Sequence, residues 1–181
     1  MSTATAPLTV DQFLRLPEEQ ARGCELVEGD VVFMGNAGSR HEIVKSNIQD
    51  ILSEYNRQNR IGKVFSETMY ALRESEARQP DVSFLLANRV AGADPDKLFQ
   101  GAPELAVEVV SSEAASDLER KVNLYLETGS QAVWVAYPED RTVRRYLPSG
   151  ASQRLRQGDY LEEPGLLPGF RAPVARFFEG I

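Results

Sequence analysis

The chain has very few of the residues that build covalent cross-links or soft-metal sites. It contains one cysteine, Cys24, and one histidine, His41. One cysteine excludes an internal disulfide framework, and these two residues cannot supply a zinc site built from cysteine and histidine ligands. The motifs G-x-S-x-G, G-x-x-x-x-G-K-S/T and G-x-G-x-x-G are also missing. Their absence argues against an α/β-hydrolase nucleophile, a P-loop and a dinucleotide-binding loop.

Long apolar runs are absent as well. No segment approaches the roughly 18 apolar residues of a membrane span, and residues 1–17 hold no apolar stretch of signal-peptide length. With 42% hydrophobic and 26% charged residues, the chain is expected to be a cytoplasmic globular protein with no membrane partner. Its 181 residues predict a single domain, 1–181. The net charge of −7 argues against nonspecific nucleic-acid binding by the whole surface.

The stretch from Gly101 to Gly129 organises the rest of the chain. Its first half, Pro103 to Val110, is almost wholly apolar and is expected to form a strand buried on both faces. Alternation along this strand places Glu108 in a row of apolar side chains. A carboxylate in such a row is costly unless a cation or several hydrogen-bond donors meet it. Glu108 is therefore a candidate metal ligand.

The second half of this stretch supplies a candidate partner for Glu108. A helix is expected to begin near Ala115 or Ser116 and to stop at Gly129. Lys121 lies at the border of its apolar stripe, from which it could reach back toward Glu108. A solvated helix lysine is the alternative, and spacing alone favours it.

The rest of the chain shows the patterns of further short strands and helices. Helices are expected at Leu8–Leu16, with Thr9 as N-cap, and at Arg40–Gln58. A polar loop with a short helix near Pro95–Phe99 is also expected. The expected strands and hairpins are Cys24–Met34, Gly62–Arg73, Val82–Leu86, Gln131–Tyr137, Thr142–Leu147, an edge hairpin over Ser152–Tyr160, and a terminal strand and helical turn within Leu166–Phe178.

Asp81 completes a group of residues suited to phosphate chemistry. It stands at the start of a strand, where a carboxylate can project into a cleft, although a simple turn residue is the alternative. Asp81 and Glu108 on neighbouring strands would hold Mg²⁺ through oxygen ligands and waters. Lys121 would orient the attacking water and offset charge that develops on a phosphate. On the same criteria Glu25 is a surface strand residue, and His41, in the first helical turn, is expected to be mostly neutral near pH 7.

The order of several short motifs resembles the Uma2 family, bacterial proteins regarded as endonucleases with a PD-(D/E)XK, restriction-endonuclease-like fold. The resemblance runs from about Cys24 to Phe178. It implies an α/β fold whose core, over about 22–178, has a mixed central sheet flanked by helices, with an N-terminal hairpin and extra C-terminal strands. It rests on Glu25–Asp30, Arg40-His41, Gln79–Val82, Gly101–Leu105, Val107–Ser111, Lys121 with Tyr125 and Gly129, and Leu167–Phe170.

This resemblance implies a role for each matching residue. Asp81 matches the aspartate of the PD motif, and Glu108 matches the acidic member of the (D/E)XK motif. The position two after Glu108 is Val110 in place of the parent lysine, and Lys121 on the next helix matches the displaced lysine. Glu25 resembles an additional acidic residue, and His41 matches the arginine–histidine pair beside the site. Ala136-Tyr137-Pro138 departs from a frequent Val-Asp-Pro, at a strand end where the change concerns the turn.

The expected function is hydrolysis of DNA by a metal-dependent endonuclease. Asp81, Glu108 and the Val109 carbonyl would bind Mg²⁺ or Mn²⁺, Glu25 would hold a second ion or a metal-bound water, and His41 would contact the phosphate or support the site. Two alternatives stay open: a non-catalytic binding or assembly module that keeps the fold, and a metal-dependent phosphodiesterase acting on RNA or a small substrate. A homodimer could form through an apolar edge near Val143–Leu155. A basic groove would draw on Arg40, Lys45, Arg73 and Arg78.

Overall fold

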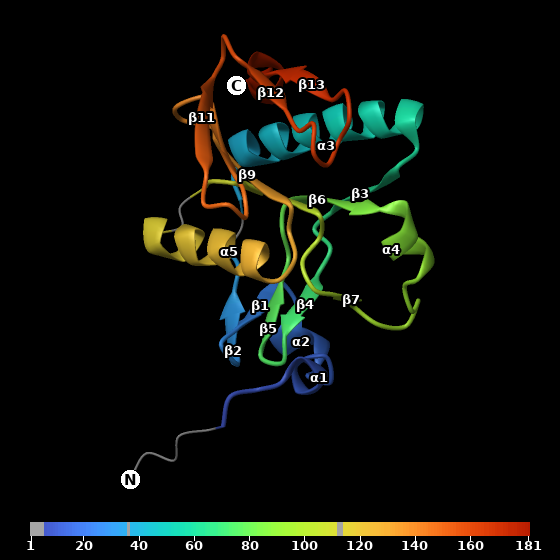
Figure 1. Cartoon of the computed structure of the whole chain (residues 1–181). Helices are drawn as coiled ribbons and strands as arrows, with labels where there is room; N and C mark the ends of the chain where they lie inside the picture. The colour runs from blue at the N-terminus through green and yellow to red at the C-terminus, as the bar shows by residue number, and fades with distance from the viewer. Residues whose placement is uncertain (1–5, 36, 112–113) are drawn as a thin grey trace.

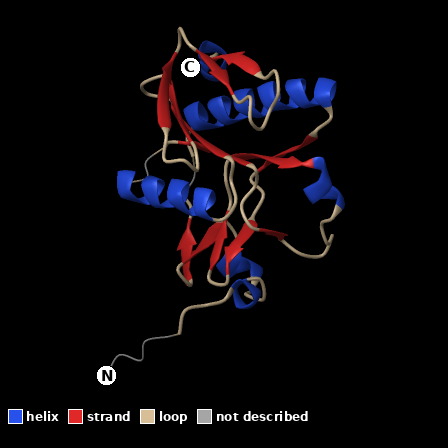
Figure 2. Cartoon of the chain, viewed as in Figure 1, coloured by secondary structure: helices blue, strands red, loops and turns tan. Residues whose placement is uncertain are grey.

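The structure is a computed structural model that describes residues 6–35, 37–111 and 114–181. Two mixed sheets and the helices packed against them form most of it (Figures 1 and 2). The expected mixed α/β class, with a central sheet flanked by helices, is therefore confirmed. Within the described ranges, no helix has the length and apolar character needed to cross a bilayer.

The larger sheet has six strands in the order β11-β10-β9-β8-β6-β3. Only β8 and β9 are parallel in it, and the helix between them makes the crossover that a parallel pair requires. Its strands are β3 (Gly62–Ser66), β6 (Val82–Leu86), β8 (Leu105–Val109), β9 (Ala132–Tyr137), β10 (Thr142–Tyr146) and β11 (Ser152–Arg156).

Helices cover both faces of this sheet. Helix α3 (Ser39–Asn59) packs on one face, and α5 (Ala115–Glu127) lies on the other, between the two sheets (Figure 1). The alternation predicted for β8 is present, because Val107 joins the core beneath α3 while Ala106 joins the core around α5. Glu108 consequently points toward α5. This is the feature that places the candidate site between α5 and the neighbouring strands.

The smaller sheet has five strands in the order β2-β1-β5-β4-β7, with β4 and β7 parallel. The predicted hairpin is present, and Glu28 and Gly29 at its tip both have positive φ, as a tight hairpin turn requires. Helices α1 (Val10–Phe13) and α2 (Glu18–Ala21) lie beside this sheet, and Thr9 caps α1 as expected. The strands are β1 (Cys24–Val27), β2 (Asp30–Phe33), β4 (Tyr70–Arg73), β5 (Glu76–Arg78) and β7 (Phe99–Gln100).

The C-terminal part adds a two-stranded sheet, β12 (Tyr160–Glu162) with β13 (Arg171–Pro173), and a 3₁₀ turn, η1 (Val174–Phe178). These elements pack near α3 at one end of the molecule (Figure 1). The prediction of an edge hairpin over Ser152–Tyr160 is wrong. Strand β11 pairs with β10, whereas Tyr160 pairs with Pro173 in the separate sheet.

Two further expectations are wrong. The short helix in the 87–100 region is α4 (Ala87–Ala91), not Pro95–Phe99, because the Asp94 carboxylate accepts the Asp96 N–H and holds that segment in a turn. Val143 and Leu155 do not form an outward apolar edge, because both are buried in the core.

Candidate functional site

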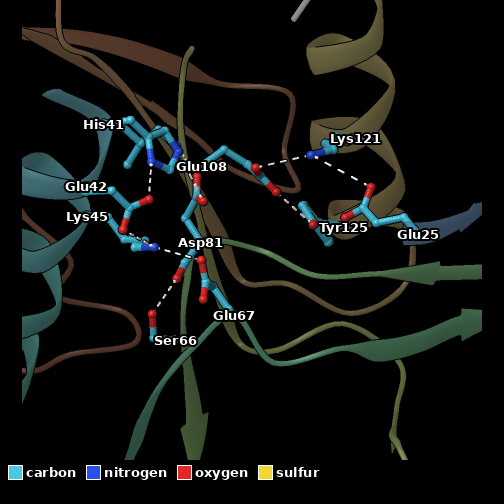
Figure 3. A network of polar contacts seen from close by, with 11 residues as sticks. Glu25, His41, Glu42, Lys45, Ser66, Glu67, Asp81, Glu108, Lys121 and Tyr125 are labelled. Carbon is cyan, nitrogen blue, oxygen red and sulfur yellow. Dashed lines mark hydrogen bonds and ion pairs between the residues drawn. The ribbon is translucent and has the colours of Figure 1, made fainter. Parts of the chain in front are cut away.

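A cleft of about 960 Å³ lies where the two sheets meet the first turns of α3 and α5. All the side chains expected at the site line it. Val109, whose backbone carbonyl is expected to bind metal, lines it too. Figure 3 shows the Asp81 carboxylate beside His41 and the Glu108 carboxylate turned toward Lys121 and Tyr125. The residues that converge are Glu25, His41, Asp81, Glu108 and Lys121.

Glu108 sits on β8 with only 3% of its surface exposed. Its Oε2 lies 3.4 Å from the Lys121 Nζ, and its Oε1 accepts a 2.8 Å hydrogen bond from the Tyr125 hydroxyl. Burial is the largest of the effects that together raise the pKa of Glu108 to about 8. The charges of Asp81 and Glu25 also raise this pKa, while Lys121 and the Tyr125 hydrogen bond lower it. The buried position therefore disfavours the ionised carboxylate more than Lys121 and Tyr125 favour it.

Lys121 is not the solvated helix lysine that spacing alone favours. It is buried, and its Nζ lies between two carboxylates, 3.4 Å from Glu108 and 3.9 Å from Glu25. Tyr125, one helical turn further along α5, contacts the same Glu108 from inside the core. The i, i+4 spacing of Lys121 and Tyr125 was the available sequence signal for this second contact.

Glu25 is likewise not a surface residue, because its side chain is 1% exposed. Strand β1 lies inside its sheet, between β2 and β5, and the side chain turns toward α5. One Glu25 oxygen accepts the Gln79 N–H at 2.8 Å, and the other lies 3.3 Å from an Arg78 guanidinium nitrogen. Arg78 also donates to buried Glu76 at 3.0 Å. Glu25 is therefore held on both oxygens by groups that the sequence did not indicate.

Asp81 immediately precedes β6, and both oxygens of its carboxylate have partners. Oδ2 accepts a 2.7 Å hydrogen bond from the Val109 N–H, which ties Asp81 to the end of β8. Oδ1 lies 3.2 Å from Nε2 of His41. The Asp81 backbone carbonyl accepts from the Ser66 hydroxyl and the Glu67 N–H, both at 3.2 Å. Asp81 is thus fixed from three directions while its side chain still faces the cleft.

His41 lies in the first turn of α3, with Nδ1 3.2 Å from a Glu42 oxygen. Burial lowers the pKa of His41, but the hydrogen bonds and charges of Asp81 and Glu42 outweigh it, so the net direction is upward. This direction is opposite to the one expected from the helix N-terminus alone. The two neighbouring carboxylates, which periodicity cannot place, favour the charged imidazolium.

A chain of ion pairs continues from His41 along α3 and was missed by sequence reasoning. Lys45 Nζ lies 2.7 Å from Glu42 and 2.7 Å from Glu67, so these groups connect α3 to the loop after β3. The hydrogen bond from Lys45, which outweighs the opposing effect of burial, lowers the pKa of Glu42. Glu42, which contacts the His41 ring nitrogen opposite the one that faces Asp81, thereby stays ionised near neutral pH and supports the charge on His41.

The four residues considered for a basic groove, Arg40, Lys45, Arg73 and Arg78, do not converge on the cleft. Of these four only Arg78 lines the cleft, and Arg78 is neutralised by Glu25 and Glu76. The others pair elsewhere: Lys45 with Glu42 and Glu67, Arg73 with Glu127, and Arg40 with Glu139.

The donor set limits what metal the cleft can hold. Within residues 6–35, 37–111 and 114–181, no three histidine, cysteine or acidic side chains are grouped closely enough to hold an ion by themselves. Asp81 and Glu108 nevertheless provide two carboxylates in one cleft, and Mg²⁺ commonly binds through one or two carboxylates while keeping several waters. Burial is the main cause of the raised pKa of Glu108, and a divalent cation bound beside it would favour the ionised carboxylate. These residues fit a hard, water-rich ion.

Comparisons with known proteins concern the family and the fold. The sequence model of the family described as "Uma2: Putative restriction endonuclease" matches residues 10–175. A crystal structure from Anabaena variabilis, described as "a putative nuclease belonging to DUF820", is similar with a TM-score of 0.82 and 22% identity. The alignment covers 95% of this chain and 98% of that one, and at this identity it concerns the fold. No curated protein matches this chain.

Proposed function

The chain belongs to the Uma2 family, and we propose that it is a metal-dependent endonuclease that hydrolyses DNA phosphodiester bonds. The observation that carries the proposal is the convergence of three side chains in one cleft: Asp81 just before β6, Glu108 on β8 and Lys121 on α5. We further propose that the larger sheet and its flanking helices are a restriction-endonuclease-like, PD-(D/E)XK core. On this proposal the missing lysine two positions after Glu108 is replaced from the next helix.

Asp81 and Glu108, with the Val109 carbonyl, would hold one Mg²⁺ or Mn²⁺. The ion would neutralise charge on the scissile phosphate and acidify a bound water. The family resemblance gives Glu25 a share in metal or water binding. Because both Glu25 oxygens already face Gln79, Arg78 and Lys121, we instead assign Glu25 to holding the Lys121 ammonium in place.

Lys121 would position the attacking water and stabilise the negative charge that develops on the phosphate. Its ammonium is already fixed between two carboxylates, so little reorganisation is needed when the reaction proceeds. His41, carrying a proton more readily than a free histidine, would hold Asp81 in its metal-binding orientation.

A non-catalytic binding module is the second candidate, and one observation favours it. Lys121 directly contacts Glu108, and no three-ligand group exists among the described residues, so the site could be a self-sufficient ion-pair cluster. Such a module would bind its partner without forming a product. The two candidates differ in whether metal and Lys121 are required.

The test is turnover on double-stranded DNA, single-stranded DNA, RNA and a small phosphodiester, each with Mg²⁺, with Mn²⁺ and with chelator. We expect DNA cleavage only with metal, and losses of about 100-fold or more in Glu108→Gln and Lys121→Met. Asp117→Asn is the matched control, because Asp117 is an exposed carboxylate of the same cleft that pairs with Arg120. It should cut like the parent.

Cleavage by Glu108→Gln and Lys121→Met at the parental rate would overturn the assignment of these residues. Metal-independent binding with no product from any substrate would favour the non-catalytic module. Turnover of only RNA or only the small phosphodiester would replace DNA as the substrate while keeping the site.

A further inference from the structure

One wall of the cleft is apolar and exposed. Val32, Phe33 and Met34 line it, with 39%, 66% and 37% of their surfaces exposed. They belong to β2 and the residue after it, and all four residues of this strand are exposed. Strand β2 is the edge of the smaller sheet, with β1 as its neighbour. Large apolar side chains gathered at a cleft are a common feature of binding sites.

The Phe33 ring is supported from one side by backbone. A Cβ built on Gly23 would lie 3.3 Å from Cε2 of Phe33, so the ring rests against a residue without a side chain. Gly23 has φ of +69°, a conformation that glycine adopts without strain. Phe33 is therefore braced by the chain while remaining the most exposed large apolar residue described.

The charges around the cleft do not suit a continuous duplex. Among the described residues, six carboxylates line it against His41 and three lysine or arginine side chains, and each of those three is already paired with a carboxylate. The phosphates of a duplex would therefore find few cations that are not already paired with a carboxylate. The carboxylates are Glu25, Glu42, Glu67, Asp81, Glu108 and Asp117, and the basic residues are Arg78, Arg120 and Lys121.

We propose that Phe33, flanked by Val32 and Met34, is a stacking platform for an unpaired base next to the scissile phosphate. The substrate is then single-stranded or locally unpaired DNA, and this inference rests on the proposed nuclease function. Stacking on an aromatic ring is tolerant of sequence and needs no cationic groove, which matches the composition of the cleft. A single nucleotide would then contact both the metal-binding carboxylates and the stacking wall.

A second copy of this chain is a less suitable occupant of the wall. Three exposed side chains are far fewer than the roughly 20–30 residues that a stable interface uses on each side. Each copy would also bring a net charge of −7. The wall opens into the same cleft as Asp81 and Glu108, which a nucleotide uses and a dimer does not require.

The test is the affinity of the full chain for a fluorescent single-stranded oligonucleotide and for its blunt duplex, by anisotropy with Ca²⁺. Gel electrophoresis of the same samples checks that the DNA stays uncleaved during the binding measurement. The parent should prefer the single strand about tenfold or more. Phe33→Ala should weaken single-strand binding by about 5- to 100-fold, Phe33→Leu by nearly as much, and Phe33→Trp should restore it. The control Val31→Ala, an exposed apolar residue of β2 outside the cleft, should bind like the parent.

Equal affinity for duplex and single strand, or equal behaviour of Phe33→Ala and Val31→Ala, would overturn the platform. Light scattering also measures the oligomeric state. If the parent is a dimer and the Phe33→Ala variant is a monomer, the apolar wall is a contact between two copies of the chain. Cleavage assays on the same DNA separate the two proposals. Binding that depends on Phe33 but gives no cleavage would support the stacking platform and refute the nuclease. Duplex cleavage at the same rate with and without the Phe33 ring would support the nuclease and refute the platform. No binding to either DNA would refute both.

Discussion

Metal binding in the cleft should release a proton from Glu108, so the affinity for Mg²⁺ should rise with pH up to about pH 8. The pKa of Glu108 is raised to about 8, mainly by burial, and a metal ion requires the ionised carboxylate. Below that pKa each pH unit should weaken binding about tenfold, equal to about 1.4 kcal/mol. Affinity near pH 6 should therefore lie about 100-fold below its plateau.

Isothermal titration calorimetry in two buffers with different ionisation heats measures both the affinity and the protons released. Near pH 7 we expect release of close to one proton per ion, and no such release in Glu108→Gln. Asp117→Asn should keep the parental slope, because its exposed carboxylate is not a proposed ligand. A Mg²⁺ affinity that does not change with pH below about 8, or binding without proton release, would refute the proposed role of Glu108 as a metal ligand.

Two further predictions concern the groups that hold the site. Tyr125→Phe removes a buried 2.8 Å hydrogen bond to Glu108, so it should cost about 1–3 kcal/mol in urea unfolding and should move the pH midpoint of metal binding upward. A midpoint unchanged from the parent would contradict the role of Tyr125. Arg78→Met leaves two buried carboxylates without their partner and should cost about 3–5 kcal/mol, whereas Arg73→Met, at an exposed pair, should cost less than about 1 kcal/mol. Equal losses in these two variants would show that burial does not set the difference.

Sequence periodicity was sufficient for the parts of the site that belong to regular elements. The apolar run around Glu108 predicted a strand buried on both faces, and the acidic residue within it predicted a special environment. The apolar stripe of α5 placed Lys121 at its border, from which it does reach Glu108. Both inferences depend on residues close in sequence, where alternation and helical spacing fix direction.

The contacts missed from sequence join residues far apart in the chain. Glu25 has the pattern of a surface strand residue, and only the pairing of β1 with β5 brings it to Arg78 and buries both. Strand β5 itself has no apolar alternation, because Glu76 and Arg78 occupy buried positions as an ion pair. The direction of the His41 pKa shift was misjudged for the same reason, because Asp81 lies 40 residues away along the chain and its position is a property of the fold.

The most direct test of the metal site is anomalous X-ray scattering from a crystal of the parent chain soaked in Mn²⁺. The account predicts a peak in the cleft in contact with carboxylate oxygens of Asp81 and Glu108, and its loss in Glu108→Gln. A peak confined to other carboxylates, with Lys121 and Tyr125 still the partners of Glu108, would contradict the metal site. It would identify the cluster as a structural ion-pair network.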